Sequence, residues 1–343
     1  MLKVWLLLPI AIVVFVLATS FNTNAQVPCG KLELEGHTYR VCRDTPTPVP
    51  TATPEPRIPS IITESGTYRG KATSSTGHCI EVRASNVIIE NAVISPCKGR
   101  GITASNVTNL TVRNSYISTQ YAPSIVDAGD GIYAFKVDTL LIEGNTFEKS
   151  QTNIEVQGSN NITIRNNVMK DPLGPYPRGQ HIQIWPEFLS TGGFGPKPIN
   201  IDILNNTMSC IVSNGCHQED AINLGSLGNG LVDGNSMTGG YSGSGCGLIL
   251  EANTEKVTVS NNLADGQQCG FGMAGGFDNR FENNIATHYT NIGFYGEAYN
   301  GICARITYTD NKVGPRPDNT YNDFWYNPAR CSTITSNGWT RIP

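Results

Sequence analysis

The sequence has few charged side chains. Aspartate, glutamate, lysine and arginine make up 15% of the 343 residues, and the formal net charge at pH 7 is −4. A protein that binds nucleic acid needs a basic face to neutralise phosphates, so this composition argues against a nucleic-acid partner. A neutral or cationic glycan fits the charge easily, whereas an acidic glycan would need a local basic cleft.

The sequence also lacks a Cys-x-x-Cys pair, the spacing typical of zinc sites. It has ten cysteines, an even number, and all of them follow residue 25. Disulfides in an oxidising compartment are therefore expected rather than a metal site. The cysteines are Cys29, Cys42, Cys79, Cys97, Cys210, Cys216, Cys246, Cys269, Cys303 and Cys331.

Residues 1–25 have the features of a secretory signal peptide. The 17 residues from Val4 to Ser20 carry no charge, and small residues precede Ala25, the expected cleavage site. An uncleaved membrane anchor is the alternative, because an apolar run of this length is at the lower limit for crossing a bilayer. Both alternatives place the rest of the chain outside the cytoplasm, either secreted or at the cell surface.

Two short segments separate this leader from the main part of the chain. In residues 26–44, Cys29 and Cys42 flank a short apolar and acidic alternation that fits a small disulfide-closed hairpin. Residues 45–60 are rich in proline and threonine. Proline fixes φ and removes a hydrogen-bond donor, so these residues are expected to form an extended polyproline II linker.

A two-strand pattern repeats from about Ile61 to residue 343. Each unit has a short apolar strand, a gap, and a second strand that ends in an asparagine-containing turn. The shortest spacing, from Asn145 to Asn167, is 22 residues. The leading apolar residues are Ile80, Ile102, Ile132, Ile154, Ile182, Ile222, Leu248, Phe271 and Ile292, and the turn residues are Asn91, Asn114, Asn145, Asn167, Asn206, Asn235, Asn262, Asn284 and Asn311.

A unit of this length is too short to bury its apolar side alone, whereas stacked units share one continuous core. Leucine-rich repeats have a similar period, but their Leu-x-x-Leu-x-Leu frame is absent. The alternation of β-branched residues from Val107 to Val112 favours sheet over helix. Asparagine tolerates left-handed backbone, and asparagines stacked in register form side-chain ladders. The sequence therefore predicts an all-β solenoid of about nine to ten turns.

This repeat resembles the right-handed parallel β-helix (pectin-lyase-like) superfamily over residues 61–343. That superfamily includes pectate lyases, polygalacturonases, alginate-active enzymes and phage tailspikes. The run from His217 to Asn223, the glycine pairs 239–240 and 275–276, and the run from Asn291 to Tyr295 are similar to a bacterial group of secreted β-helix proteins without an assigned activity. The signature motifs of polygalacturonases, mannuronan epimerases and pectate lyases are absent from the chain, so the resemblance implies the fold and leaves the reaction open.

Polar side chains concentrate on the third to sixth units. When the units are stacked, residues just after the leading apolar residue share an outward column, and residues two before it share another. The longest insertions, residues 170–178 and 186–198, belong to the same units and carry aromatic rings such as Phe188 and Phe194, which suit the apolar face of a sugar. A polysaccharide-binding groove is expected here, with binding residues Tyr133, Lys136, Tyr176, Gln183, Trp185, His217 and Asn223.

Two kinds of chemistry fit this groove. Asp220, beside Glu219, is the first candidate for a catalytic carboxylate. Glu155 lies two units away, roughly 9 to 10 Å along the stack. Such a separation is near the upper limit for an inverting glycosidase and too long for a retaining one.

The alternative chemistry is β-elimination from a uronate. Arg178, His181 or Lys136 would then neutralise the uronate carboxylate or abstract the C5 proton. The expected function is thus a polysaccharide lyase or glycoside hydrolase. The competing hypothesis from another class is a non-catalytic glycan-binding or surface-display module.

The sequence leaves the cofactor open. Asp127 and Asp130 suggest calcium, but two carboxylates supply few of the six to eight oxygens that this cation takes.

Disulfide pairing follows from the stacking. Cys246 and Cys269 stand two residues before the leading residue of consecutive units, so their Cα atoms should lie about 5 Å apart, within disulfide range. The remaining local pairs are expected to be Cys79 with Cys97, Cys210 with Cys216, and Cys303 with Cys331.

Overall fold

The computed structural model describes residues 30–34, 37–41, 56–121, 129–175, 178–298 and 302–343. The chain divides into two units, residues 1–54 and 55–343. In the first, β1 (Gly30–Leu34) and β2 (His37–Val41) form the expected antiparallel hairpin, with Gly30 opposite Val41. The leader and the candidates Cys29, Cys42, Asp127 and Tyr176 lie outside the described residues.

Within the described ranges, no helix is long and apolar enough to span a membrane.

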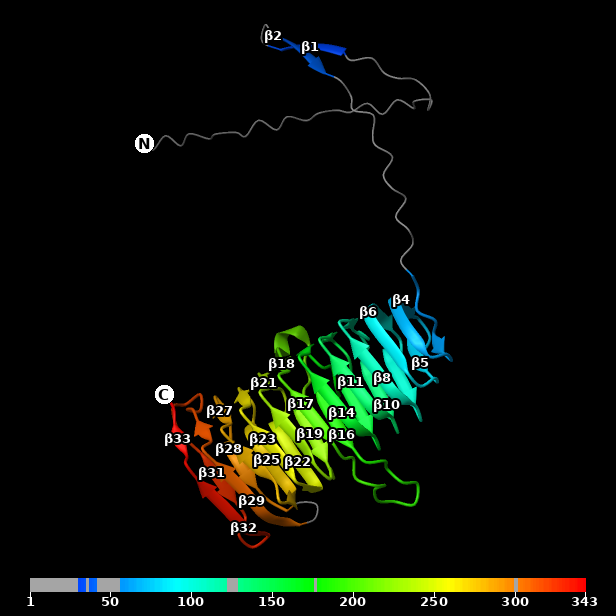
Figure 1. Cartoon of the computed structure of the whole chain (residues 1–343). Helices are drawn as coiled ribbons and strands as arrows, with labels where there is room; N and C mark the ends of the chain where they lie inside the picture. Colours follow the sequence, from blue (N-terminus) through cyan, green and yellow to red (C-terminus); the bar gives the residue numbers. More distant parts are fainter. Residues whose placement is uncertain (1–29, 35–36, 42–55, 122–128, 176–177, 299–301) are drawn as a thin grey trace, which may run out of the picture. The chain divides into compact units, whose positions relative to one another are not determined.

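The second unit is a right-handed parallel β-helix (Figure 1). Three strands make one turn, and each strand pairs in parallel with the equivalent strands of the turns before and after it, as β10 does with β7 and β13. The first face consists of β5 (Ile80–Val82), β7 (Ile102–Ser105), β10 (Ile132–Phe135), β13 (Ile154–Gln157), β16 (Ile182–Trp185), β19 (Ile222–Gly225), β22 (Cys246–Glu255), β25 (Cys269–Phe277), β28 (Ile292–Gly296) and β31 (Phe324–Tyr326).

The two other faces complete each turn. The second consists of β6 (Val87–Cys97), β8 (Thr108–Arg113), β11 (Asp138–Glu143), β14 (Asn160–Arg165), β17 (Ile201–Leu204), β20 (Gly230–Asp233), β23 (Val257–Ser260), β26 (Arg280–Glu282), β29 (Cys303–Thr309) and β32 (Cys331–Asn337). The third consists of β9 (Tyr116–Ile117), β12 (Thr146–Glu148), β15 (Val168–Lys170), β18 (Thr207–Ser209), β21 (Ser236–Thr238), β24 (Leu263–Asp265), β27 (Ile285–Thr287), β30 (Lys312–Val313) and β33 (Thr340–Arg341). β3 (Ile61–Ile62) and β4 (Gly66–Ser74) begin the helix, and the 3₁₀-helix η1 (Val212–Asn214) lies in a connection.

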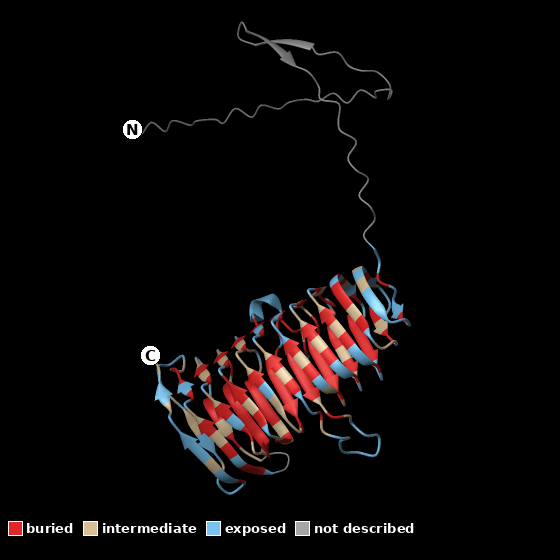
Figure 2. Ribbon diagram, viewed as in Figure 1, coloured by how far each residue is buried: buried red, intermediate tan, exposed pale blue. Residues whose placement is uncertain are grey.

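The core is a column of aliphatic side chains along the axis. Ile132 lies opposite Ile154, which lies opposite Ile182, and all three are fully buried. Figure 2 shows this burial continuing along the stacked strands. Because side chains alternate along a strand, fixing these residues inward turns their immediate neighbours outward. Ile58, which the sequence assigned to the linker, also belongs to the core, so the helical unit begins before residue 61.

The register of the ninth turn differs from the expected one. Phe271 pairs with Phe294, whereas Ile292 pairs with Cys269. The predicted leading residue, Ile292, was therefore wrong by two residues, because β28 begins two residues before the residue that enters the core. Phe294 fills that position, fully buried and stacked on Phe271 with ring centroids 5.0 Å apart. The outward residue of this turn is consequently Tyr295, not Gly293.

An internal ladder of asparagines runs beneath the turns. It consists of Asn145, Asn167, Asn206, Asn235, Asn262, Asn284 and Asn311, each at most 1% exposed. Each side-chain amide donates to the carboxamide oxygen of the next, as Asn167 Nδ2 does to Asn206 Oδ1 at 2.9 Å. The expected first members, Asn91 and Asn114, stand one residue too early and instead adopt the left-handed backbone of the turn. In the turn that contains Asn114, Ser115 occupies the ladder position, and its backbone N–H donates to Asn145 Oδ1.

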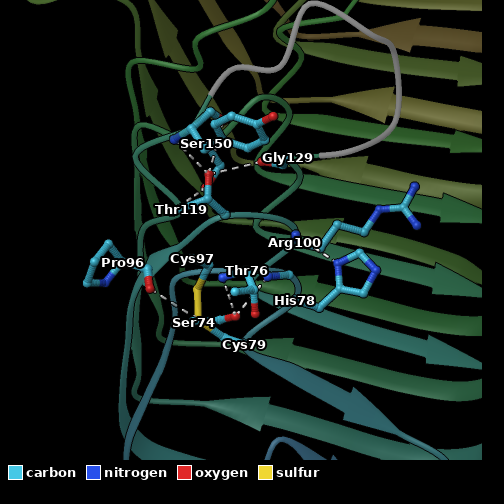
Figure 3. The surroundings of a disulfide bond; sticks show 12 residues. Ser74, Thr76, His78, Cys79, Pro96, Cys97, Arg100, Thr119, Gly129 and Ser150 are labelled. Atoms are coloured by element: carbon cyan, nitrogen blue, oxygen red, sulfur yellow. Dashed lines mark hydrogen bonds between the residues drawn. A yellow bond between two sulfur atoms is a disulfide. The ribbon is translucent and has the colours of Figure 1, made fainter.

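Among the described residues, four disulfides form in the pairs expected from the sequence: Cys79–Cys97, Cys210–Cys216, Cys246–Cys269 and Cys303–Cys331. The last two join strands of adjacent turns, whereas Cys210–Cys216 closes a connection with a sequence separation of six residues. Cys246 lies directly opposite Cys269 on adjacent strands, with Cα atoms 4.5 Å apart. Figure 3 shows the surroundings of the Cys79–Cys97 bond near the start of the helix, where Ser74 Oγ accepts a hydrogen bond from the Gly77 backbone.

Candidate functional site

Two outward columns of the first face meet the insertions and form the candidate site. The first column passes through Tyr133, Glu155, Gln183, Asn223, Ile249, Gly272 and Tyr295. The second lies two residues further along each strand and passes through Phe135, Gln157, Trp185, Gly225, Glu251 and Ala274. Because Gln183 pairs with Asn223, the Trp185 and Gly225 positions are also neighbours. Polar residues dominate the first column as far as Asn223.

An ion-paired cluster occupies the N-terminal part of these columns. Glu155 is 1% exposed and accepts a hydrogen bond from Gln157 Nε2 at 2.7 Å. The Arg178 guanidinium lies 3.6 Å from Glu155 and donates to Gln183 Oε1 at 2.9 Å. Both charges are therefore engaged within the protein, and Glu155 belongs to this cluster rather than to the surroundings of Asp220.

Three aromatic rings form a shelf beside the cluster. The aromatic shelf consists of Trp185, Phe188 and Phe194, whose ring centroids lie 5.3 to 5.8 Å apart. Phe188 and Phe194 are 53% and 42% exposed. A Cβ at Gly225 would lie 2.3 Å from the Trp185 ring, so glycine is required for the indole to lie against β19.

An acidic pocket of about 400 Å³ continues the site toward the C-terminus. Four carboxylates line it, and none of its described lining residues is basic. Glu219 accepts a hydrogen bond from Ser244 Oγ at 3.1 Å through Oε1, while its Oε2 has no hydrogen-bond partner among the described residues. The lining residues are Glu219, Asp220, Gly243, Ser244, Ile249, Glu251, Gln268, Cys269, Ala274, Asn291, Ile292, Tyr295 and Glu297.

Asn223 joins the aromatic shelf to the acidic pocket. Its Nδ2 donates to Asp220 Oδ2 at 2.9 Å and to Glu251 Oε2 at 3.2 Å. The two carboxylate oxygens are therefore no more than about 6 Å apart, since both contact one nitrogen within hydrogen-bond distance. On the other side, Asn223 Oδ1 accepts a hydrogen bond from Trp185 Nε1 at 2.7 Å.

Both linked carboxyl groups have raised pKa values. Burial raises the pKa of Asp220 to about 7, although hydrogen bonds from Asn223 and the Cys246 backbone oppose the rise. Burial also raises the pKa of Glu251, and the nearby Glu219 charge adds to this. Asp220 is thus the member of the pair with a pKa near neutrality, as a general acid requires.

The structure places several sequence candidates outside this arrangement. His181 is completely buried, contacts Asn153 through Nδ1, and has its pKa lowered to about 3 by burial, so a role as base or cation at the surface was a wrong expectation. Lys136 pairs with Glu187 at 2.9 Å, and the Tyr133 ring lies under the Arg100 guanidinium.

Two further candidates lie at the edges of the first face. The exposed His217 ring contacts Tyr241, with centroids 4.5 Å apart. Asp130, suggested for calcium, accepts a hydrogen bond from Arg100 Nε at 2.9 Å. In the part of the chain that the structure describes, no group of three or more histidine, cysteine, aspartate or glutamate residues is placed to hold a metal ion.

The sequence interpretation missed Glu251, Tyr295 and Glu297. Glu251 stands three residues after the leading Leu248, in the second outward column, which the sequence reading did not use. Including that column would have identified Glu251 beside Trp185 and Gly225. Tyr295 was missed because of the two-residue register error in its turn.

Comparisons with known proteins agree with the architecture. A family model described as "Right handed beta helix region" matches residues 67–175. A periplasmic alginate epimerase is similar, with a TM-score of 0.53 at 8% identity over 81% of this chain and 76% of that one. The catalytic unit of a GH87 α-1,3-glucanase from Streptomyces thermodiastaticus gives a TM-score of 0.49 at 14% identity over 78% of this chain. This chain spans about half (49%) of that unit.

A surface adhesin of Streptococcus pneumoniae is also similar, with a TM-score of 0.44 at 13% identity over 81% of this chain and 80% of that one. No curated protein matches the sequence significantly. At such identities, similarity to solved structures concerns the fold. Strand register, the family match over residues 67–175 and the similarity to the epimerase structure together identify the fold as a right-handed parallel β-helix.

Proposed function

We propose that the protein is a secreted glycoside hydrolase that cleaves a neutral or cationic polysaccharide in the acidic pocket. The observation that carries this proposal is the pair Asp220 and Glu251, two carboxyl groups hydrogen-bonded to one amide in an open pocket. Most glycosidases catalyse hydrolysis with two carboxyl groups that differ in proton affinity. The four disulfides support an oxidising, extracellular location.

The separation of the pair favours a retaining mechanism, for which about 5 to 5.5 Å is usual. Asp220 gives its proton to the glycosidic oxygen as the bond to the anomeric carbon breaks, and the electron pair leaves with that oxygen. The ionised Glu251 carboxylate forms an ester with the anomeric carbon. Water then attacks this carbon, its proton passes to Asp220, and the ester bond breaks to regenerate Glu251. The earlier expectation of an inverting pair with Glu155 gives way to this one.

Hydrolysis fits the pocket better than β-elimination does. A lyase must neutralise a uronate carboxylate and abstract a proton with a base. Arg178 is engaged with Glu155 and Gln183, and His181 is buried and neutral. A uronate in the acidic pocket would also face four acidic side chains and no basic lining residue, so nothing in the described lining would neutralise its charge.

The aromatic shelf supports a polymeric substrate. It lies next to the pocket, and its exposed rings offer a surface for the apolar face of further sugar units. Binding energy from such remote units serves catalysis when it positions the scissile bond.

Turnover on a panel of neutral, amino-sugar and uronate polysaccharides tests the proposal. We expect new reducing ends from a neutral or amino-sugar polymer, without the absorbance of unsaturated uronates. Asp220→Asn and Glu251→Gln should each lower kcat at least about a hundredfold while glycan binding persists. Asp202→Asn, on β17 of the second face and outside the pocket, is the matched control and should retain most activity. Unsaturated uronate products would refute the hydrolase.

A non-catalytic glycan-binding protein is the second candidate. It is favoured by one observation: both Asp220 oxygens accept hydrogen bonds from the protein, Oδ1 from the Cys246 backbone at 2.7 Å and Oδ2 from Asn223. A buried carboxylate with a purely structural role would look the same. Binding of a glycan to the parent protein without cleavage on the whole panel would establish this second function.

A further inference from the structure

The side-chain amide of Asn223 has both polar atoms engaged. It is 6% exposed, its oxygen accepts from Trp185 Nε1, and its nitrogen donates to Asp220 and Glu251. An amide nitrogen has two hydrogens, so each carboxylate can take one. The amide therefore makes one contact with the aromatic shelf and two with the acid-base pair.

Trp185 determines which way this amide points. The indole nitrogen only donates, so it must face the Asn223 oxygen. A flipped amide would set its NH₂ group against the indole N–H, so the hydrogen bond to Trp185 would be replaced by a contact between two donors. The Trp185 ring itself has little freedom, because it lies against Gly225 on one side and contacts Phe188 and Phe194 on the other.

We propose that Asn223 is a positioning residue, oriented by the Trp185 indole, which holds Asp220 and Glu251 in register and couples the aromatic shelf to the acid-base pair. Its part in turnover rests on the proposed function, whereas its effect on the two carboxyl groups does not. The neighbouring Phe188, Phe194 and Gly225 hold the indole in place, and the indole in turn holds the amide.

Trp185→Phe separates the two roles of the indole, because it keeps a ring on the shelf and removes the N–H donor. Freed from this donor, the Asn223 amide would cease to be fixed toward the carboxylates, and both would lose hydrogen bonds that stabilise their ionised forms. Carboxyl carbon NMR titration of the unliganded protein measures the result directly. We expect the apparent pKa values of Asp220 and Glu251 to move upward relative to the parent.

Phe194→Leu is the matched control, because it reduces the aromatic shelf without touching Asn223. It should weaken glycan binding several-fold and leave both titration curves unchanged. Asn223→Ser is the second variant, which removes the amide itself and should shift the carboxyl titrations in the same direction as Trp185→Phe. With an active preparation, Trp185→Phe should lower kcat about tenfold and move the pH optimum upward, while Phe194→Leu mainly raises KM.

The outcomes separate this inference from the proposed function. The inference is overturned if the titration curves of Trp185→Phe superimpose on those of the parent. This holds even if Asn223→Ser shifts the curves, because Trp185 would then not orient the amide. An upward shift in both variants supports the inference. If the protein cleaves no glycan but these shifts occur, the coupling stands and the hydrolase proposal fails.

Discussion

Asp220 carries the most unusual electrostatics among the candidate residues. Its side chain is 5% exposed, yet it lines a pocket and is linked to Glu251 through one amide. Burial raises its pKa from the usual 3.8 to about 7. A carboxyl group that keeps its proton at neutral pH is suited to donate it to a leaving oxygen.

The raised pKa of Asp220 predicts a pH-dependent stability. Between pH 3.8 and about 7 the folded protein retains a proton that the unfolded chain has lost. Folding stability contributed by this group is therefore fully present below pH 3.8 and decreases as the pH rises toward 7. The side chain introduced by Asp220→Asn does not titrate. The unfolding free energy of this variant minus that of the parent should therefore increase from pH 3.8 to about 7 and stay constant at higher pH.

Chemical denaturation at several pH values between 4 and 8 measures this difference. A constant offset is expected in addition, because the asparagine NH₂ would face a donor in place of an accepting oxygen. Asp202→Asn, a partly exposed aspartate on β17, controls for the general loss of a carboxylate. A difference between Asp220→Asn and the parent that does not vary with pH would show that Asp220 is not protonated in the folded state.

The sequence identified part of the site at this scale. Repeats and insertions in the sequence placed Asp220, Asn223 and Trp185 on the same face, and the structure brings these three proposed site residues into contact. His181 was misassigned, since it immediately precedes the leading Ile182, and nothing in its sequence context revealed that its side chain lies in the interior. Glu251 was missed because the sequence analysis did not use the second outward column, although that column repeats with the same period.

At the scale of the elements, the asparagine ladder holds successive turns in register. The side chain of Asn206 shows how fully the ladder amides are hydrogen-bonded. Its nitrogen donates to Ile164 O and Asn235 Oδ1, and its oxygen accepts from the backbone and side chain of Asn167, all within 3.0 Å. The recurring asparagines were recognised in the sequence as turns with a possible ladder, but their exact position at the first turns required the backbone.

Removing one ladder amide should destabilise the helix strongly. Asn206→Ala leaves several buried donors and acceptors without partners, so we expect a loss of about 3 to 5 kcal/mol in unfolding free energy. Asn229→Ala is the matched control. That partly exposed asparagine exchanges hydrogen bonds with Asn200, which water can replace, and its loss should cost less than about 1 kcal/mol. Similar denaturation midpoints for the two variants would contradict a structural role for the ladder.

At the scale of the whole molecule, the fold was predictable because it is a repeat. Each turn places apolar residues at the same phase, so one frame, read over many turns, specified most of the core and the Cys246–Cys269 pair. The same frame predicted two strands per unit, whereas the structure has three, because the short third strand after each asparagine turn was not recognised. The site did not follow in the same way, since it is built where the repeat is broken: by the insertion with Phe188 and Phe194, by the glycine beneath Trp185, and by the shifted register at Tyr295.

The parallel stack converts these local irregularities into one surface. Strands of adjacent turns lie about 4.8 Å apart, so residues distant in sequence, such as Trp185 and Glu251, reach the same part of the first face. The aromatic shelf and the acidic pocket adjoin on it. The central claim is our proposal that Asp220, as acid and base, and Glu251, as nucleophile, cleave a glycan on this surface.

The pH dependence of kcat/KM on the best substrate of the panel tests this claim most directly, because it reports the proton affinities of the free enzyme. We predict a bell-shaped profile. Its rate falls at high pH as Asp220 loses its proton near pH 7, and falls at low pH as Glu251 becomes protonated. In Asp220→Asn the residual rate should lack the high-pH limb. A rate that stays level from pH 6 to pH 9, or a high-pH limb that persists in Asp220→Asn, would contradict the assignment of Asp220 as the acid.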